Sequence, residues 1–270
     1  MAKTVLVTGA SAGIGKATAI YLAKNGYNVY AAARRIEKMQ DLKTYGIKPI
    51  SMDITKEESL VACIDQILIE TKSIDVLINN AGSGYYGALE DMPIKDAKYQ
   101  LDVNVFGAAR LIQLVLPTMR KSRYGKIINI SSVGGKVTLP MGSWYHASKF
   151  AIEGLSDALR KEVKPFGIDV IVIEPGGTKS EMTGLGKEYM SRVSGNSTYS
   201  QLAKGVINMY TTIEKDAADP IVIAKLIKKG IEAKNPKTRY VGASGAKMML
   251  FFRKMLSDKM FDKLIMSQMK

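Results

Sequence analysis

The sequence predicts an α/β protein with a single-domain doubly wound Rossmann fold, in which helices cover both faces of a parallel seven-stranded sheet. Strand-like apolar runs alternate with helix-like segments six times along the chain. Several of the runs are apolar throughout, which is typical of strands that are buried on both faces. Polar and glycine residues follow the strands, at the edge where open α/β sheets bind ligands.

Strands are expected where short runs rich in β-branched and aromatic residues lie between turn residues. In chain order these runs occupy 5–7, 27–33, 47–52, 74–78, 126–130, 168–173 and 238–241. The intervening segments carry helical periodicity. The expected helices occupy 16–24, 36–44, 93–120 and 143–163, with a further helix whose apolar face comprises Leu60, Ile64, Ile67 and Leu68.

Local signals also mark helix starts. Thr55 and Glu58 have the spacing of a capping box, and Asp219 followed by Pro220 is typical of an N-cap and first helical turn. Between 178 and 215 the pattern weakens, because glycines and polar residues interrupt it. We expect a flap with short helices in this segment. The whole chain, 1–270, is predicted to form one domain.

Composition excludes several classes of protein. Cys63 is the single cysteine and His146 the single histidine, so we expect no intrachain disulfide and no metal site. The residues before the first strand leave no room for a signal peptide, and no stretch is long enough to span a membrane, which favours a cytoplasmic location. The net charge of +14 comes from scattered residues, which indicates a basic solvated surface and no nucleic-acid partner.

The turn after the first strand can hold a phosphate group. Its sequence is Thr8-Gly-Ala-Ser-Ala-Gly-Ile-Gly15, and a helix follows it directly. Glycines let a ligand approach the main chain, and helix N-termini favour anions, so a dinucleotide pyrophosphate is one candidate ligand. A plain tight turn is the alternative. The same residues also match a nucleophile elbow centred on Ser11, which would need His146 as its base.

Tyr145 and Lys149 lie four residues apart at the start of an expected helix, so they share one face. A nearby ammonium group stabilises a phenolate and lowers the pKa of the tyrosine. The pair can therefore act as a general acid and base. A tyrosine that packs on the stem of a surface lysine is the alternative reading of this spacing.

Taken together, these motifs resemble those of the short-chain dehydrogenase/reductase family over residues 3–180. The resemblance rests on the glycine turn, Asn79-Asn80-Ala81-Gly82, Asn104, Ser132, Tyr145-x-x-x-Lys149 and Pro175-Gly176. It implies that Tyr145 is the catalytic acid or base, that Lys149 lowers its pKa and binds the nicotinamide ribose, and that Ser132 binds the substrate oxygen. Asn104 would hold a water molecule of a proton relay. The tail around Pro236–Tyr240 and Phe261-Asp262 is similar to a subgroup that contains 17β-hydroxysteroid and retinol dehydrogenases.

The expected cofactor is NADP(H). Ala33 ends the second strand where an acidic residue would bind the ribose of NAD, and Arg34 and Arg35 follow it. Arginine suits a 2′-phosphate, although exposure to solvent is the simpler reading for Arg35. Thr178 and Ser180 depart from the usual family residues after the sixth strand. The resemblance assigns to cofactor binding Gly9, Ser11, Gly13, Ile14, Gly15, Arg34, Arg35, Asp53, Ile54, Asn80, Ala81, Gly82, Tyr145, Lys149, Pro175, Gly176, Thr178 and Ser180.

The expected activity is hydride transfer between this cofactor and a carbonyl or alcohol group of a hydrophobic, steroid-like or retinoid-like substrate. Apolar residues of the flap and Met141 and Trp144 would line its site. A non-catalytic NADP-binding sensor and a serine hydrolase are the alternatives. The tail at 244–270 is apolar and basic, so it either contacts a membrane or lines the substrate entry as an amphipathic helix pair. Packing on the sheet edge or in a dimer interface is the alternative. The family resemblance implies a homodimer or homotetramer.

Overall fold

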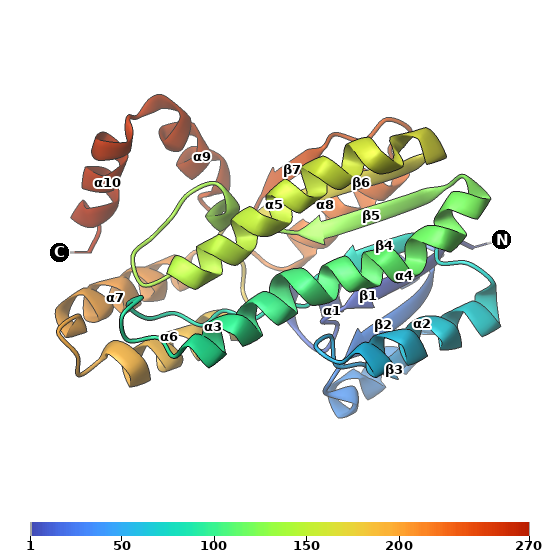
Figure 1. The fold of residues 1–270 in the computed structure, drawn as a ribbon, viewed down its shortest axis with the longest axis horizontal. Coiled ribbons are helices and arrows are strands. Elements are labelled where there is room, and N and C mark those ends of the chain that lie inside the picture. The colour runs from blue at the N-terminus through green and yellow to red at the C-terminus, as the bar shows by residue number, and fades with distance from the viewer. Residues whose placement is uncertain (1, 270) are drawn as a thin grey trace.

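The computed structural model describes residues 2–269 and contains a seven-stranded sheet with the strand order β3-β2-β1-β4-β5-β6-β7 (Figure 1). Every neighbouring pair of strands is parallel. The strands are β1 (Thr4–Thr8), β2 (Asn28–Ala33), β3 (Lys48–Ser51), β4 (Val76–Asn79), β5 (Gly125–Ile130), β6 (Ile168–Pro175) and β7 (Arg239–Gly242). The predicted Rossmann sheet is confirmed.

Helices cover both faces of this sheet. The helices α2 (Glu57–Thr71), α4 (Gly107–Ser122) and α5 (Ser143–Val163) bury their apolar sides against one face. The opposite face carries α1 (Gly13–Ala23), the 3₁₀ helix η1 (Ile36–Tyr45) and α8 (Ile221–Glu232). Alternation along β1 supplies both layers, because Leu6 faces the first and Val5 and Val7 face the second.

The order of the strands reverses at β1. The chain runs outward through β2 and β3, then returns to place β4 on the other side of β1. The turn after β1 therefore opens into the crevice at a topological switch point, where open α/β sheets bind ligands.

The helix expected at 93–120 contains an irregular segment. It consists of α3 (Ile94–Leu101), a π-helical segment η2 (Asp102–Phe106) and α4. A π turn holds one residue more than an α turn, and such turns are frequent at functional sites. Asn104 lies in the middle of η2 and is buried.

The helix expected at 36–44 is present as the 3₁₀ helix η1, but two other local predictions were wrong. The capping box fails because Thr55 donates its hydroxyl to Asp53 Oδ1 at 2.8 Å, and α2 begins at Glu57 without a side-chain cap. The flap contains two full-length helices in place of short ones, α6 (Glu181–Ser194) and α7 (Ser200–Lys215).

The C-terminal tail forms a helix pair, α9 (Ala246–Met255) and α10 (Asp258–Ser267), which stands apart from the sheet in Figure 1. Phe261 and Ile265 of α10 are buried against Val137, whereas Met248 and Phe251 of α9 are exposed. No helix within residues 2–269 combines the length and apolar character needed to cross a bilayer.

Candidate active site

The turn after β1 forms a cradle that only glycine can build. Gly9 and Gly13 adopt φ angles of +65° and +53°, which favour glycine. A Cβ on Gly9 would lie 2.7 Å from Ala81 Cα, and one on Gly15 would lie 2.4 Å from the Gly9 carbonyl oxygen. The first turn of α1 therefore packs directly on the β1 turn.

Asn80 fastens the loop after β4 to this cradle. Its side-chain amide donates to the carbonyl oxygens of Thr8 at 2.9 Å and Gly9 at 3.3 Å. The Thr8 hydroxyl accepts hydrogen bonds from the backbone amides of Asn80 and Ala81, both at 3.0 Å. The structure thus gives Asn80 the task of shaping the cradle, while contact between Asn80, Ala81 or Gly82 and a cofactor stays a prediction.

The N-terminus of α1 fits a pyrophosphate. Ala12 occupies the N-cap position and has no side-chain group to satisfy the first amides of the helix. The first turn also lacks acidic residues, so the positive end of the helix dipole at Gly13, Ile14 and Gly15 is available to an anion. Together with the glycine cradle, this arrangement suits a dinucleotide.

Positive charge gathers where β2 ends. Arg34 donates from Nη1 to the Tyr99 hydroxyl at 2.6 Å. Arg35 is exposed, as the simpler interpretation of the sequence expects, and it donates to Ser11 Oγ at 3.2 Å and to Glu181 Oε2 at 2.8 Å. The Arg35 guanidinium therefore bridges the glycine turn and the start of α6, and Lys38 contacts the same Glu181 carboxylate at 3.3 Å.

Two residues after β3 border this region. Asp53 accepts hydrogen bonds from the backbone amide and the hydroxyl of Thr55, at 3.0 and 2.8 Å. Ile54 is buried, and a Cβ on Gly107 would lie 2.5 Å from its side chain. The start of α4 therefore holds Ile54 in place, and the adenine contacts of both residues stay predictions.

Ser132 follows β5 directly. Its Oγ accepts a hydrogen bond from the Gly134 amide at 3.0 Å and caps the short 3₁₀ helix η3 (Val133–Gly135). Because this bond uses only an acceptor position of the hydroxyl, Ser132 can still donate its own proton to one neighbouring oxygen.

Tyr145 and Lys149 lie on one side of α5, as the spacing predicts. The Lys149 Nζ is 5.9 Å from the centre of the Tyr145 ring and donates to the Ile130 carbonyl oxygen at 2.9 Å. Both side chains are buried, with Tyr145 7% and Lys149 8% exposed. Ile130 ends β5, so this bond anchors Lys149 to the ligand-binding edge of the sheet.

Burial controls the ionisation of both groups. It raises the pKa of Tyr145, whereas hydrogen bonding by the hydroxyls of Ser132 and Tyr86 lowers it. Burial lowers the pKa of Lys149 to about 8, against the opposing negative charge of Glu153. The stabilisation of a Tyr145 phenolate by Lys149 stays a prediction, since in this state the two hydroxyls act on Tyr145.

Asn104 holds the loop beside the site. Its side-chain amide donates to the Ser83 carbonyl oxygen and to Ser148 Oγ, both at 2.9 Å, and its Oδ1 accepts from the Ser83 amide at 2.8 Å. These contacts link η2, α5 and the loop after β4. The side chain is thereby fully engaged, and the water molecule expected at Asn104 stays a prediction.

The segment after β6 borders the glycine cradle. A Cβ on Gly13 would lie 3.6 Å from Ser180 Cβ, which places the start of α6 against the turn after β1. The Thr178 hydroxyl donates to the Gly176 carbonyl oxygen at 3.1 Å. Gly176 follows Pro175, and its backbone amide donates to the Gly242 carbonyl oxygen at 2.8 Å. Ser180 therefore lies beside the turn after β1, while cofactor contacts of Pro175, Gly176, Thr178 and Ser180 stay predictions.

His146 does not support the hydrolase alternative. Its Nδ1 lies 2.9 Å from the Gly134 carbonyl oxygen, and its Nε2 accepts from the Leu139 amide at 2.9 Å. Burial lowers the pKa of this imidazole, in keeping with a neutral ring that carries its proton on Nδ1. Ser11 Oγ contacts Arg35, so the two partners of a hydrolase dyad bind elsewhere.

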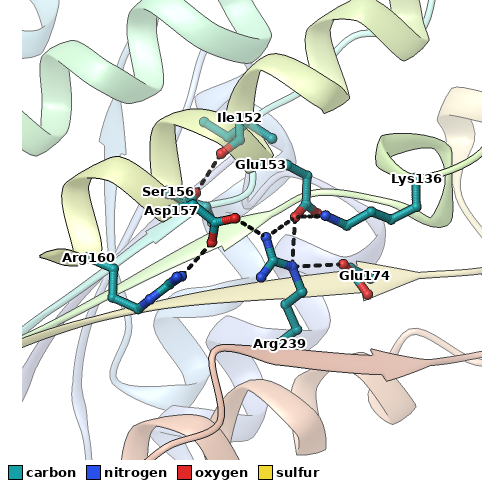
Figure 2. A network of polar contacts seen from close by, with 9 residues as sticks. Lys136, Ile152, Glu153, Ser156, Asp157, Arg160, Glu174 and Arg239 are labelled. Atoms are coloured by element: carbon teal, nitrogen blue, oxygen red, sulfur yellow. Dashed lines mark hydrogen bonds and ion pairs between the residues drawn. The ribbon is translucent and has the colours of Figure 1, made fainter.

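A partly buried ionic network holds the helix that carries Tyr145 and Lys149 (Figure 2). Glu153 of α5 meets Lys136 at 3.0 Å and Arg239 of β7 at 2.9 Å. Arg239 also contacts Asp157 at 2.7 Å and the Glu174 carboxylate at 3.3 Å. The network therefore ties α5 to β6 and β7 behind the site.

Sequence reasoning missed some residues that the structure brings to the site. Glu153 and Glu174 are buried, and carboxylates are rarely buried without a partner. A carboxylate among apolar residues was therefore a signal in the sequence for an ionic contact. Tyr86 packs against Tyr145 at a ring-centre distance of 5.1 Å, and Tyr210 packs against Tyr86 at 5.5 Å. The sequence does not reveal that these three phenols meet, because they come from distant segments.

Comparison with known proteins identifies the family. The sequence model of a family described as short chain dehydrogenase matches residues 3–189. A 3-ketodihydrosphingosine reductase from Bacteroides thetaiotaomicron is 37% identical over 87% of this chain and 86% of its own length. Retinol dehydrogenase 8 from Bos taurus is 32% identical over 88% of this chain and 80% of its own length.

Solved structures have the same fold. A short-chain dehydrogenase from Streptomyces avermitilis has a TM-score of 0.82 and 31% identity, covering 98% of this chain and 95% of its own. A metagenomic short-chain oxidoreductase in complex with NADP has a TM-score of 0.71 and 25% identity, covering 89% of this chain and 96% of its own.

Proposed function

This chain belongs to the short-chain dehydrogenase family, and from that premise we propose that it transfers a hydride between NADP(H) and a carbonyl or alcohol group of a hydrophobic substrate. The observation that carries the proposal is the placement of Ser132 and Lys149 at the carboxyl end of β5, with Tyr145 on the same side of α5 as Lys149. Because every strand pair is parallel, this is the same edge of the sheet as the glycine cradle after β1. Short-chain dehydrogenases are oxidoreductases, which favours an enzyme over a sensor without turnover.

The residues of the chain can perform the acid and base steps. When bound, NADPH supplies the hydride. During reduction the Tyr145 hydroxyl donates its proton to the substrate oxygen, and during oxidation its phenolate takes that proton back. Ser132 donates a hydrogen bond to the same oxygen and stabilises the charge that develops there. The Lys149 ammonium donates one N–H to the Ile130 carbonyl oxygen, so its other two N–H groups can donate to the ribose hydroxyls.

The basic residues after β2 support NADP(H) over NAD(H). Arg35 contacts Ser11 and shares the Glu181 carboxylate with Lys38, and Arg34 directly precedes it in the chain. An adenosine 2′-phosphate would add negative charge beside these cations. A relative of similar fold has been solved in complex with NADP. The glycine cradle and the uncapped start of α1 would hold the pyrophosphate.

The substrate region supports a hydrophobic compound. Tyr145 belongs to an apolar cluster formed with the flap helices α6 and α7, whose members include Tyr86, Met141, Met182, Met190, Val206 and Tyr210. The names of two relatives specify a ketodihydrosphingosine and retinol. We therefore favour a long-chain ketone or alcohol, or a retinoid-like or steroid-like one.

A substrate panel tests this function. Long-chain ketones, retinoid aldehydes and steroid ketones are mixed with enzyme and NADPH, and the absorbance of NADPH is followed. Wild type should consume NADPH with at least one class, while Tyr145→Phe should bind NADPH, as seen by fluorescence, without consuming it. NADPH binding without turnover across the panel would support the sensor. Ester hydrolysis that Ser11→Ala abolishes would support the hydrolase.

Exposed apolar residues support self-association. Phe106 next to α4 and Phe150 on α5 are 62% and 45% exposed in the single chain. A homodimer or homotetramer that packs through these helices would cover both rings. Light scattering on wild type and on Phe106→Glu should show an assembly and its loss.

The tail supports a peripheral lipid contact. Phe261 and Ile265 of the tail pack against Val137, as expected of a tail that packs on the rest of the protein. Met248, Phe251 and Met255, however, remain at least 59% exposed. Lys247 and Lys254 flank them. An apolar face with basic residues is suited to an anionic lipid surface.

A further inference from the structure

Three tyrosine rings pack against one another in a continuous cluster at the candidate active site, each tilted relative to the next. Tyr145 of α5 packs against Tyr86 with ring centres 5.1 Å apart, and Tyr86 packs against Tyr210 of α7 with ring centres 5.5 Å apart. Tyr86 and Tyr145 are each only 7% exposed. Both rings belong to an apolar cluster with the flap helices, and a buried hydroxyl in such a cluster requires a hydrogen-bond partner.

Two glycines hold the Tyr86 ring in place. A Cβ on Gly186 of α6 would lie 2.7 Å from the Tyr86 ring, and a Cβ on Gly84 would lie 3.0 Å from it. Gly186 lies in the middle of α6 without a positive φ, at a position where glycine lowers helix stability by about 1 kcal/mol relative to alanine. The backbone of α6 does not require a glycine at this position. The glycine is explained by the ring of Tyr86, which leaves no room for a Cβ.

Several polar groups face the Tyr145 ring from the elements that pack on it. From α5 come Lys149, at 5.9 Å from the ring centre, and His146, which lies edge-on at 5.6 Å. Ser132 approaches from β5, Tyr86 from the loop after β4, and Tyr210 from α7 behind Tyr86. Glu153 acts on Tyr145 only indirectly, through Lys149.

Most of these groups have other tasks. Lys149 donates to Ile130, the neutral His146 ring binds Gly134 and Leu139, and Ser132 would turn to the substrate oxygen. The hydroxyl of Tyr86 is therefore the group left to donate to the phenolate oxygen of Tyr145 during turnover.

We propose that Tyr86 is a positioning residue whose hydroxyl donates a hydrogen bond to the oxygen of Tyr145 and stabilises its phenolate, with Tyr210 holding Tyr86 in place. The proposal rests on the proposed function, because it assumes that Tyr145 is the acid or base. Hydrogen bonding from Tyr86 lowers the pKa of Tyr145, which burial otherwise raises. Without that donor, the base should form only at higher pH.

The first test is the pH dependence of alcohol oxidation with 2-decanol and NADP⁺ as the probe pair. In Tyr86→Phe the inflection of kcat/KM should move upward by about one pH unit. Tyr210→Phe should shift it less, in the same direction. Gly186→Ala, which displaces the Tyr86 ring, should also raise it. Tyr85→Phe is the matched control, because Tyr85 stacks on Tyr189 at 4.6 Å, and it should leave the inflection unchanged.

A lower kcat in Tyr86→Phe with an unchanged inflection would overturn the proposal, since a purely structural role predicts that result. A second measurement needs no substrate. The ultraviolet absorbance of tyrosinate is titrated in the wild type and in Tyr145→Phe, and their difference reports Tyr145 alone. The same difference taken in the Tyr86→Phe background should appear at higher pH, and an equal pH would refute the proposal. If 2-decanol is not oxidised, the substrate assignment is weakened while the titration still decides the role of Tyr86.

Discussion

The guanidinium of Arg239 on β7 donates from Nε to the carboxylate of Glu153 on α5 at 2.9 Å, one helical turn beyond Lys149 (Figure 2). The Glu153 side chain is 4% exposed and that of Arg239 is 24% exposed. A strand at the edge of the sheet thus neutralises a carboxylate one helical turn from Lys149.

Arg239→Leu should destabilise the protein by about 3 kcal/mol, because it leaves the buried Glu153 and Glu174 carboxylates without their shared cation. Urea unfolding followed by circular dichroism measures the change. Arg110→Leu, which removes an exposed partner of Glu57, is the control and should have no measurable effect. Equal stabilities of Arg239→Leu and wild type would show that the network does not stabilise the fold.

Glu174 should make stability depend on pH. Burial and the negative charge of Glu153 raise its pKa to about 7, above the value near 4.3 of an unfolded chain. The folded state therefore binds more protons between these two values, and the free energy of unfolding falls as pH rises through this window. Between pH 5 and pH 8 the contribution lost is on the order of 2 kcal/mol. Glu174→Gln should lose less stability over this range, and an identical loss in both proteins would contradict the assignment.

Arg34→Ala should raise the KM for NADPH about tenfold and leave the KM for NADH nearly unchanged, since a charge-assisted bond to the 2′-phosphate is removed. Steady-state kinetics with both cofactors measures the ratio. Lys43→Ala removes the same charge at the far end of η1 and should change neither KM. A clear preference of the wild type for NADH would refute the NADP(H) assignment.

Glu181→Gln should lower the KM for NADPH a few-fold. The Glu181 carboxylate holds Arg35 and Lys38 at 2.8 and 3.3 Å, so it competes with a 2′-phosphate for both cations. Glu188→Gln on the exposed side of the same helix is the matched control and should have no effect. An increase in KM would mean that Glu181 assists cofactor binding.

The tail should bind vesicles that contain an anionic phospholipid. Flotation with wild type and with the triple variant Met248→Glu, Phe251→Glu, Met255→Glu should show binding and its loss, since the three side chains are exposed. Ile69→Glu, at an 84% exposed position on α2, should float like wild type. Equal flotation of the triple variant and wild type would end the lipid interpretation, and a changed oligomeric state would favour a protein contact.

The sheet was predictable because its pattern is local. Each strand is an apolar run that ends in turn residues, and alternation along β1 alone identifies both covered faces. The flap was less predictable, since Gly184, Gly186 and Gly195 indicate a broken segment. Gly186 is nevertheless part of α6, where it packs against the ring of Tyr86. That contact joins residues 100 positions apart in the sequence, so a local pattern does not reveal it.

The candidate site was predictable in its residues but less so in their partners. The spacing of Tyr145 and Lys149 places both on one face, and the structure agrees. That Lys149 binds Ile130, and that Glu153 meets Arg239, depends on how α5 packs against β5 and β7. Such tertiary pairings have no signature in a single sequence.

The π turn around Asn104 also affects how this chain should be aligned with its relatives. Removing one residue from Asp102–Phe106 would restore a regular α-helix and rotate every later side chain of α4 by about 100° relative to α3. A one-residue gap in this stretch of an alignment would therefore signal a rearranged helix rather than a trimmed loop. A homologue with such a gap would present a different side chain to Ser83 and Ser148.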